Sequence, residues 1–237
     1  MFIAGKIAAV RERISTAAIR AGRDPRDITL MAVTKTVDPG QIREAYDAGI
    51  RVFGENRVQE FAGKISALND LRDAEWHMIG HLQTNKTGQA AQLFSHMDSV
   101  DSLRLARKLN HAASDTGKKL PVLIEINIGL EAAKSGIAPN SAELQGLLTG
   151  AAELPSLDFH GLLTVPPYSN DPERSRPYFR QMRALFADIA SQGLPAIRMD
   201  VLSMGMSHDF EVAIEEGATC VRVGTAIFGE RKTRVQG

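Results

Sequence analysis

The sequence lacks the features that mark secreted and membrane proteins. It contains one cysteine, Cys220, so no disulfide can form within the chain, which suits a reducing compartment. No stretch approaches the roughly 18 consecutive apolar residues of a membrane span. The first residues include the charged Lys6, Arg11 and Glu12 and lack the apolar core of a signal peptide. We therefore expect a cytoplasmic protein that does not enter a membrane.

The chain also lacks an excess of charge of either sign. Lysine and arginine together number 28, aspartate and glutamate together number 28, and the formal net charge is zero. A neutral chain has no overall attraction to nucleic acids or to anionic membrane surfaces. We expect neither as a partner, and any anionic ligand has to be held by a local site.

A regular alternation of two patterns fills the chain. Its 237 residues are close to the roughly 250 of one (β/α)8 barrel. Ile3, Ile7, Val10 and Ile14 recur at helical spacing, which predicts a leading helix over residues 1–22. Short apolar runs then alternate with helical patterns. The expected strands are 29–33, 51–53, 76–79, 96–100, 121–128, 159–164, 199–203 and 219–223, and the expected helices include 38–48, 102–113, 141–152, 172–191 and 208–216.

This alternation predicts a parallel sheet built from right-handed βαβ units. Eight strands in this length favour an α/β fold with a closed (β/α)8 barrel of the TIM type and an extra N-terminal helix. We expect a single domain over residues 1–237, with the barrel over 28–230. An open, doubly wound sheet is the alternative. In a closed barrel, the carboxyl ends of the strands form the functional rim.

The fifth expected strand has one polar face. Val122, Ile124 and Ile126 alternate with Glu125 and Asn127, so the two sets point to opposite faces. In a barrel the second set lines the interior, which therefore turns polar toward the carboxyl end of the strand. The alternative is an edge strand whose polar face meets water.

An arginine in the eighth expected strand is also predicted to face the interior. Arg222 alternates with Val221 and Val223. A buried guanidinium keeps its charge, so it needs an acceptor or an anionic ligand. A structural ion pair with Glu125 or Asp200 is the simplest alternative to a ligand.

Lys35 follows the first expected strand and has the same parity as Met31 and Val33. If that face is the interior, the amine lies at the rim of the barrel. Desolvation favours the neutral amine, which can form a Schiff base with an aldehyde. The alternative is a lysine that extends from the strand end into water.

The loops after the seventh and eighth strands contain glycines that suit a phosphate. Segments 203–207 and 224–229 carry Gly205, Gly224 and Gly229. Glycine lets the backbone approach a ligand closely, and barrels often bind phosphate in these two loops. Ordinary turn glycines are the alternative. Ser207 is expected to cap the helix that follows.

No metal site is expected from the sequence. His77 and His81 are four residues apart, but they lie across a strand end, and no third ligand stands nearby in the sequence. The basic segment 231–234 is expected to be a solvated terminus.

Several of these segments together resemble one protein family. Residues 32–35, 53–56, 77–86, 203–207 and 221–229 are similar to the pyridoxal phosphate homeostasis proteins, which are related to the N-terminal barrel of alanine racemase. The resemblance implies that the cofactor is pyridoxal 5′-phosphate (PLP), held as a Schiff base on Lys35. It further implies that Arg222 meets the pyridine nitrogen, that Asn56 lines the pocket, and that three residues lie at the phosphate. These three are Ser203, Gly224 and Thr225.

The same resemblance implies a role in intracellular vitamin B6 homeostasis with little catalytic activity. An arginine cannot give the ring nitrogen a proton, so the ring is a weak electron sink. Racemases of this type take a second base with the help of a separate C-terminal domain, for which this chain has no counterpart. We therefore expect a monomer that binds PLP, with PLP-dependent apoenzymes as candidate partners. The alternatives are a PLP-dependent amino-acid racemase and a Schiff-base aldolase acting on a phosphorylated sugar.

Overall fold

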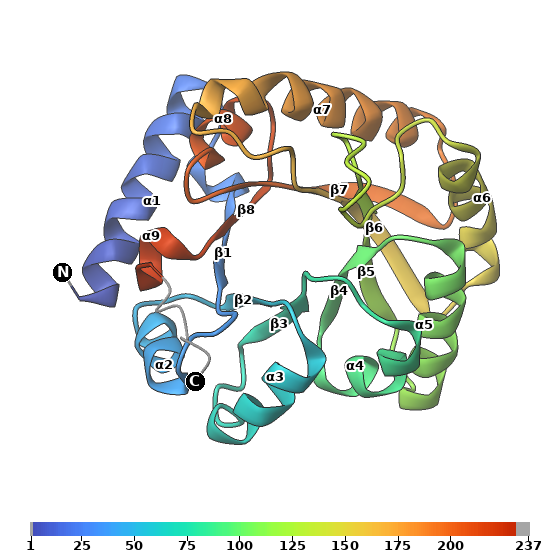
Figure 1. Ribbon diagram of the computed structural model, residues 1–237, viewed down its shortest axis with the longest axis horizontal. Helices are drawn as coiled ribbons and strands as arrows, with labels where there is room; N and C mark the ends of the chain where they lie inside the picture. The colour runs from blue at the N-terminus through green and yellow to red at the C-terminus, as the bar shows by residue number, and fades with distance from the viewer. Residues whose placement is uncertain (1, 231–237) are drawn as a thin grey trace.

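Eight parallel strands form a closed barrel, in which each strand pairs with its neighbours in the chain and β1 pairs with β8 (Figure 1). The computed structural model describes residues 2–230, so the segment 231–234 lies outside the described residues. The strands are β1 (Thr29–Val33), β2 (Val52–Glu55), β3 (Glu75–Met78), β4 (His96–Val100), β5 (Leu120–Ile126), β6 (Leu157–Thr164), β7 (Ile197–Met206) and β8 (Cys220–Val223). The predicted barrel is confirmed, and the open sheet is excluded.

Helices surround the barrel on its outside (Figure 1). They are α1 (Ile3–Arg20), α2 (Pro39–Asp47), α3 (Val58–Lys64), α4 (Thr87–Leu93), α5 (Leu103–Thr116), α6 (Ala142–Gly150), α7 (Arg176–Ser191), α8 (Phe210–Glu215) and α9 (Thr225–Phe228). Short 3-10 turns occupy Pro25–Asp27, Ile65–Ala67, Thr84–Lys86, Ala151–Glu153 and Pro172–Ser175. Within residues 2–230, no helix is both long and apolar enough to span a membrane.

Local sequence explains where several helices begin and end. The hydroxyls of Ser102 and Ser141 accept from the amides of Leu105 and Leu144, which caps the first turns of α5 and α6. Gly117 ends α5 in the left-handed conformation, with φ 66°. These local signals place the helix ends within a few residues of their expected positions.

The alternation of side chains along β5 is as predicted. Val122, Ile124 and Ile126 belong to the apolar core between the barrel and the helices, whereas Leu123 is buried outside that core cluster. Strand β5 pairs with both β4 and β6, so it is not an edge strand. The carboxylate of Glu125 therefore faces the barrel interior.

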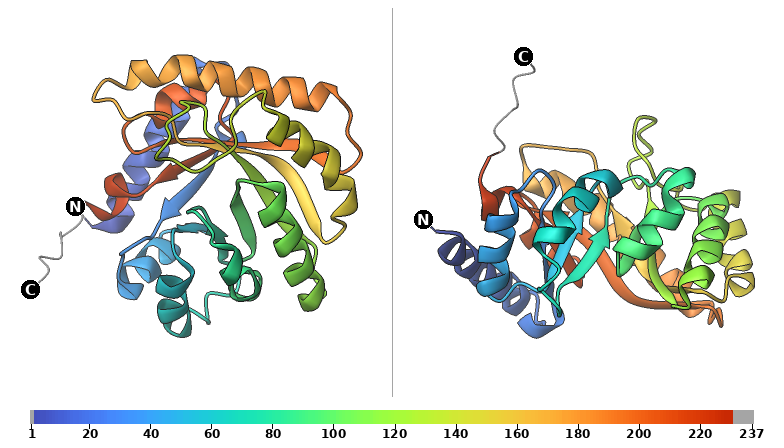
Figure 2. Two further views of the ribbon diagram at one scale, coloured as in Figure 1. Left: turned by 45° about the vertical axis from the view of Figure 1, so that its right-hand side comes forward. Right: turned by 90° about the horizontal axis from the view of Figure 1, so that it is seen from below.

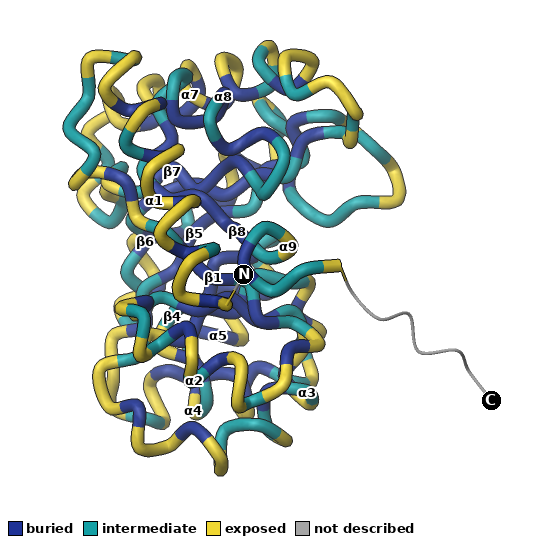
Figure 3. The backbone as a smooth tube through the Cα atoms, turned by 90° about the vertical axis from the view of Figure 1, so that its left-hand side faces the viewer, coloured by how far each residue is buried: buried dark blue, intermediate teal, exposed yellow. Residues whose placement is uncertain are grey.

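Helix α1 covers the barrel beside α8 and α9. Its apolar side chains at Ile7, Val10 and Ile14 are buried, and Arg13 makes two hydrogen bonds to Glu211 of α8, of 3.0 and 2.8 Å. Figure 3 shows the strands buried and the outer turns of the helices exposed. All neighbouring strands pair in parallel, so their carboxyl ends and the following loops share one rim. Figure 2 shows the barrel from two further sides.

Candidate functional site

Lys35 lies in a tight turn directly after β1. The lysine is half-buried, and Thr36 after it has a φ of 63°. A β-branched residue seldom adopts this left-handed conformation, because its side chain clashes with the backbone. The amide of Thr36 donates to a carboxylate oxygen of Glu60 at 2.5 Å, and this bond holds the strained turn in place.

Four side chains, which we name the Lys64 network, anchor this turn: Thr34, Glu55, Glu60 and Lys64. The ammonium of Lys64 donates to the Thr34 carbonyl at 2.9 Å, to Glu55 at 3.1 Å and to Glu60 at 2.6 Å. The Thr34 hydroxyl donates to Glu55 at 2.7 Å. The network therefore ties both sides of Lys35 to the end of β2 and to α3.

The Lys64 network contains a carboxylate that is fully removed from water. The side chain of Glu55 has an exposed fraction of 0%. Burial raises the pKa of Glu55, although Lys64 and the Thr34 hydroxyl oppose that rise. The pKa of Glu60 is lowered, because bonds from Lys64 and the Thr36 amide outweigh its burial.

Arg222 points into the barrel interior, as predicted. It is 3% exposed, its Nη1 donates to the Ser203 hydroxyl at 2.8 Å, and its Nη2 donates to the Thr164 carbonyl at 2.7 Å. Within residues 2–230 its guanidinium forms no ion pair, and Asp200 pairs with Arg198 instead, at 2.9 Å. The alternative of a structural ion pair with Glu125 or Asp200 is therefore wrong.

The half-buried Glu125 has a buried carboxylate oxygen that is not hydrogen-bonded within the described part of the chain. Burial raises the pKa of Glu125 to about 7; Asp101 adds to the rise, and Arg222 and His81 oppose it. A buried guanidinium and a half-buried carboxyl with one unbonded oxygen form no ion pair with each other, which suits a polar ligand between the strand ends.

The loops after β7 and β8 are tied together by Ser207. Its hydroxyl accepts from the amides of Gly224 and Ala226 at 3.2 and 3.4 Å. The expectation that Ser207 caps the next helix is wrong, because α8 begins at Phe210, beyond it. Ser207 instead holds the glycine loop at the end of β8.

Glycine is required at Gly205 on this rim, whereas Gly224 has room for a Cβ but packs closely against β1. Gly205 has a φ of 92°, and a Cβ there would lie 2.5 Å from the Cβ of Ala213. A Cβ on Gly224 would lie 3.4 Å from the carbonyl oxygen of Val33, two residues before Lys35. The loop after β8 therefore packs directly against the end of β1.

The residues predicted from sequence gather at four adjacent strands. Lys35 follows β1, and Asn56, half-buried, follows β2. The other four lie on β7, on β8 and directly after it: Ser203, Arg222, Gly224 and Thr225. Closure of the barrel places β7, β8, β1 and β2 side by side, so these residues lie in one sector of the barrel.

The predicted residues differ in how far they are buried. Ser203 and Arg222 are buried, Gly224 is half-buried and Thr225 is exposed. The Ser203 hydroxyl accepts from Arg222 in the interior, whereas Ser207 is the hydroxyl that contacts the glycine loop. A contact between Ser203 and a phosphate stays a prediction, and Ser207 is a candidate that sequence reasoning did not assign to the ligand.

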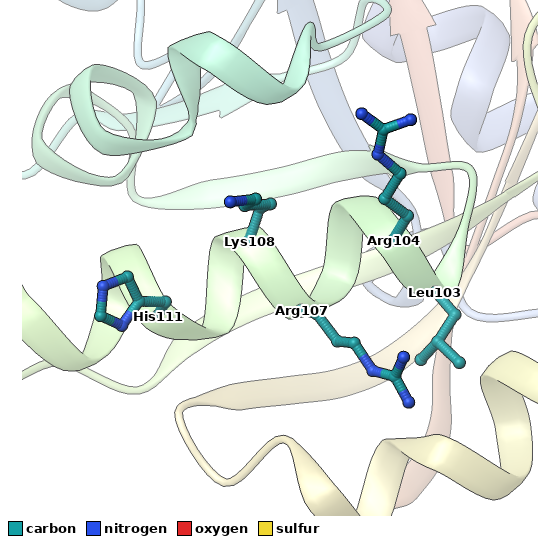
Figure 4. Close-up of a pocket in the computed structure, with 5 residues that line it drawn as sticks. All are labelled: Leu103, Arg104, Arg107, Lys108 and His111. Atoms are coloured by element: carbon teal, nitrogen blue, oxygen red, sulfur yellow. The ribbon is translucent and has the colours of Figure 1, made fainter.

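A depression on α5 is a weaker candidate. It is lined by Leu103 and four basic or titratable side chains: Arg104, Arg107, Lys108 and His111. Figure 4 shows that these side chains leave the helix in different directions and do not converge on one point. The helix lies on the outside of the barrel, away from the shared rim (Figure 1). The rim is therefore the better site.

Solved structures share this barrel. PipY of Synechococcus elongatus, solved without PLP, is 36% identical with a TM-score of 0.85, over 96% of this chain and 100% of that one. PipY solved with PLP bound has a TM-score of 0.83 over the same shares. Alanine racemase of Clostridium difficile is 17% identical with a TM-score of 0.69 and shows the fold alone; the match covers 94% of this chain and 56% of the racemase.

Sequence comparisons assign the family. The model of the alanine racemase N-terminal domain matches residues 6–232. The pyridoxal phosphate homeostasis protein of Aquifex aeolicus is 47% identical over 227 residues, which are 96% of this chain and 97% of the relative. That of Escherichia coli K12 is 46% identical over 231 residues, 97% of both chains. This chain therefore belongs to the pyridoxal phosphate homeostasis protein family and carries an alanine racemase N-terminal domain.

Proposed function

We propose that this chain binds pyridoxal 5′-phosphate at the rim formed by β7, β8, β1 and β2 and serves intracellular vitamin B6 homeostasis. The main support is Arg222, a buried guanidinium that forms no ion pair within residues 2–230 and lies on β8, which pairs with the strand that Lys35 follows. Such a charge calls for an acceptor from a ligand. The relatives' names and the PLP-bound PipY structure support the choice of ligand.

Each rim residue has a proposed part in this site. PLP, when bound, supplies an aldehyde for a primary amine and an electron-withdrawing ring. Lys35 supplies the amine for the Schiff base, and Arg222 donates a hydrogen bond to the ring nitrogen. Asn56 lines the pocket beside the ring. The proposed phosphate contacts come from Ser203, Gly224 and Thr225, with the Ser207 hydroxyl fixing the loop that carries the last two.

Arg222 would disfavour transamination and decarboxylation chemistry on bound PLP. Its guanidinium is held by Ser203 and the Thr164 carbonyl, and an arginine keeps its protons at physiological pH. It therefore leaves the ring nitrogen unprotonated, which weakens carbanion stabilisation. The Lys64 network holds the Lys35 turn rigidly, which suits retention of a ligand. We further propose that the chain binds PLP in the cytoplasm as a monomer and supplies it to PLP-dependent apoenzymes.

The deciding experiment is reconstitution with PLP, followed by reduction with borohydride and mass analysis of the peptides. We expect a visible absorption band, loss of that band on reduction, and a modified peptide that contains Lys35. Lys35→Ala should abolish both band and modification. Lys119→Ala is the matched control, because Lys119 is exposed and pairs only loosely with Asp158, at 3.9 Å. A wild-type chain that takes up no PLP, or one labelled elsewhere, refutes the proposal.

Three further measurements separate the alternatives. Sustained conversion of L-amino acids to their mirror images, followed by chiral analysis, would favour a racemase. Borohydride trapping only in the presence of a sugar phosphate, by a colourless protein, would favour an aldolase. Transfer of PLP to an added apoenzyme, together with hydrodynamic sizing, tests the proposed partners and the monomeric state.

A further inference from the structure

Three histidines line the interior near the amino end of the barrel. Trp76 stacks against Phe53, with ring centroids 4.9 Å apart, and packs against Phe61 of α3. Trp76 therefore faces the helices, and its neighbours Glu75 and His77 face the interior. His96 and His160 complete the layer: the His77 and His96 rings are stacked at 4.0 Å, and the His96 and His160 rings are 6.0 Å apart.

Imidazoles are unusual in this position, because branched apolar side chains normally fill a barrel interior. Strand pairing sets the first two histidines opposite each other, since His77 and His96 are register partners on the parallel strands β3 and β4. Glu75 lies two residues before His77 and begins β3. Three side chains with metal-ligating atoms thus meet at one end of two neighbouring strands.

His77 is oriented as metal-binding histidines are. Its Nδ1 lies 2.8 Å from a carboxylate oxygen of Asp98, and its side chain is only 11% exposed. Its Nε2 is buried and has no hydrogen-bond partner within the described residues. A carboxylate on one ring nitrogen fixes the tautomer and directs the other nitrogen toward a metal ion.

We propose that Glu75, His77 and His96 bind a divalent transition-metal ion of the zinc class. One ligand atom from each lies within 4.8 Å of the other two. Two imidazole nitrogens and a carboxylate oxygen are a donor set that zinc accepts, with water in the fourth position. The side chain of Glu75 is 54% exposed, so an ion can reach the site from solvent.

The electrostatics of the site favour a cation. Two carboxylates face the His77 ring: an oxygen of Asp98 lies 2.8 Å from its Nδ1, and an oxygen of Glu75 lies 3.8 Å from its Nε2. Asp98 itself is 1% exposed, so its negative charge is poorly screened by water. The surroundings of the buried Nε2 are therefore electronegative, which attracts a metal ion.

Binding an ion requires a small local rearrangement. Zinc holds nitrogen and oxygen ligands at about 2.0–2.1 Å, so the three donor atoms have to close to about 3.3 Å from one another. The stacked rings of His77 and His96 are 2° from parallel. Because a ring nitrogen binds metal in the plane of its ring, His96, which is only half-buried, has to turn out of the stack.

Zinc binding to the full chain, without added PLP, tests this site independently of the proposed function. Calorimetry should give one zinc ion per chain, and cobalt substituted for zinc should give a visible absorption band. Glu75→Gln and His77→Gln should each weaken binding more than about 100-fold, and Asp98→Asn about 10–100-fold. His111→Gln is the matched control, since that histidine is 83% exposed on α5.

Two results overturn the proposal. The first is a wild-type chain that binds no zinc, in which case the His77, Asp98 and Glu75 contacts form only an ion-pair cluster. The second is zinc binding that is unchanged by Glu75→Gln. Because Glu75 is exposed at the barrel end, this variant should fold, so it decides the matter even if His77→Gln does not fold.

Discussion

Replacing Lys64 by methionine should destabilise the protein far more than loss of an ordinary surface lysine. Methionine keeps most of the side-chain volume and removes the ammonium that contacts Glu55 and Glu60, at 3.1 and 2.6 Å. The Glu55 side chain is 0% exposed, and that of Lys64 is 11% exposed. Removing one partner of a buried ion pair costs about 3–5 kcal/mol, since the other charge stays buried without compensation.

The lower end of that range suits this site, because the Thr34 hydroxyl still donates to Glu55 after the change. A loss of about 3 kcal/mol in a domain of this size lowers the melting temperature by about 6–12 °C. Differential scanning calorimetry on the protein without ligand measures this change in melting temperature. The matched control is Arg43→Met, which breaks an exposed ion pair with Asp70 and should cost less than about 1 kcal/mol.

The loss of stability in Lys64→Met should depend on pH, and its direction follows from Glu55. Burial raises the folded-state pKa of Glu55 above its unfolded value, so this carboxyl favours folding at low pH, and that contribution is lost as pH rises through the folded pKa. Without Lys64 the pKa rises further. The loss of stability caused by Lys64→Met should therefore become smaller as pH falls. Adding Glu55→Gln to Lys64→Met should restore part of the stability.

The Lys64 reasoning fails if the variant melts within about 2 °C of the wild type, or no lower than Arg43→Met. It also fails if the second substitution, Glu55→Gln, restores nothing. In either case the contacts of Lys64 would be those of a solvated surface lysine rather than of a buried network.

Two further predictions concern the carboxyl of Glu125 and the backbone of Gly205. Glu125→Gln removes a carboxyl whose pKa is raised by burial from 4.5 to about 7. As pH rises between those two values, the wild type should therefore lose stability relative to this variant. A difference in melting temperature that stays constant across that range contradicts this prediction. Gly205→Ala should lower the free energy of unfolding, measured by chemical denaturation, by about 1–3 kcal/mol, because φ is 92° and the new Cβ would lie 2.5 Å from the Cβ of Ala213. The control is Gly193→Ala, which is also at positive φ but has open space around it and should lower the free energy of unfolding less.

The sequence by itself determined the barrel and the strands that carry the site. Strand and helix periodicities are local, so each element could be located from its own residues, and alternation placed Glu125 and Arg222 on the interior face. Strand boundaries were less certain. Strand β7 extends through Gly205 to Met206, beyond the expected end at 203, because pairing with β8 continues across an irregular register.

Only the tertiary structure decided which side chains meet. Arg222 bonds to Ser203 and to the Thr164 carbonyl, 19 and 58 residues away, and the pairing depends on closure of the barrel. The same holds for Lys64 beneath the Lys35 turn and for Ser207 on the glycine loop. In the sequence the nearest histidine to His77 is His81, whereas strand register sets His77 against His96. Periodicity determines which face a residue occupies, and only the packing of distant strands determines what it meets there.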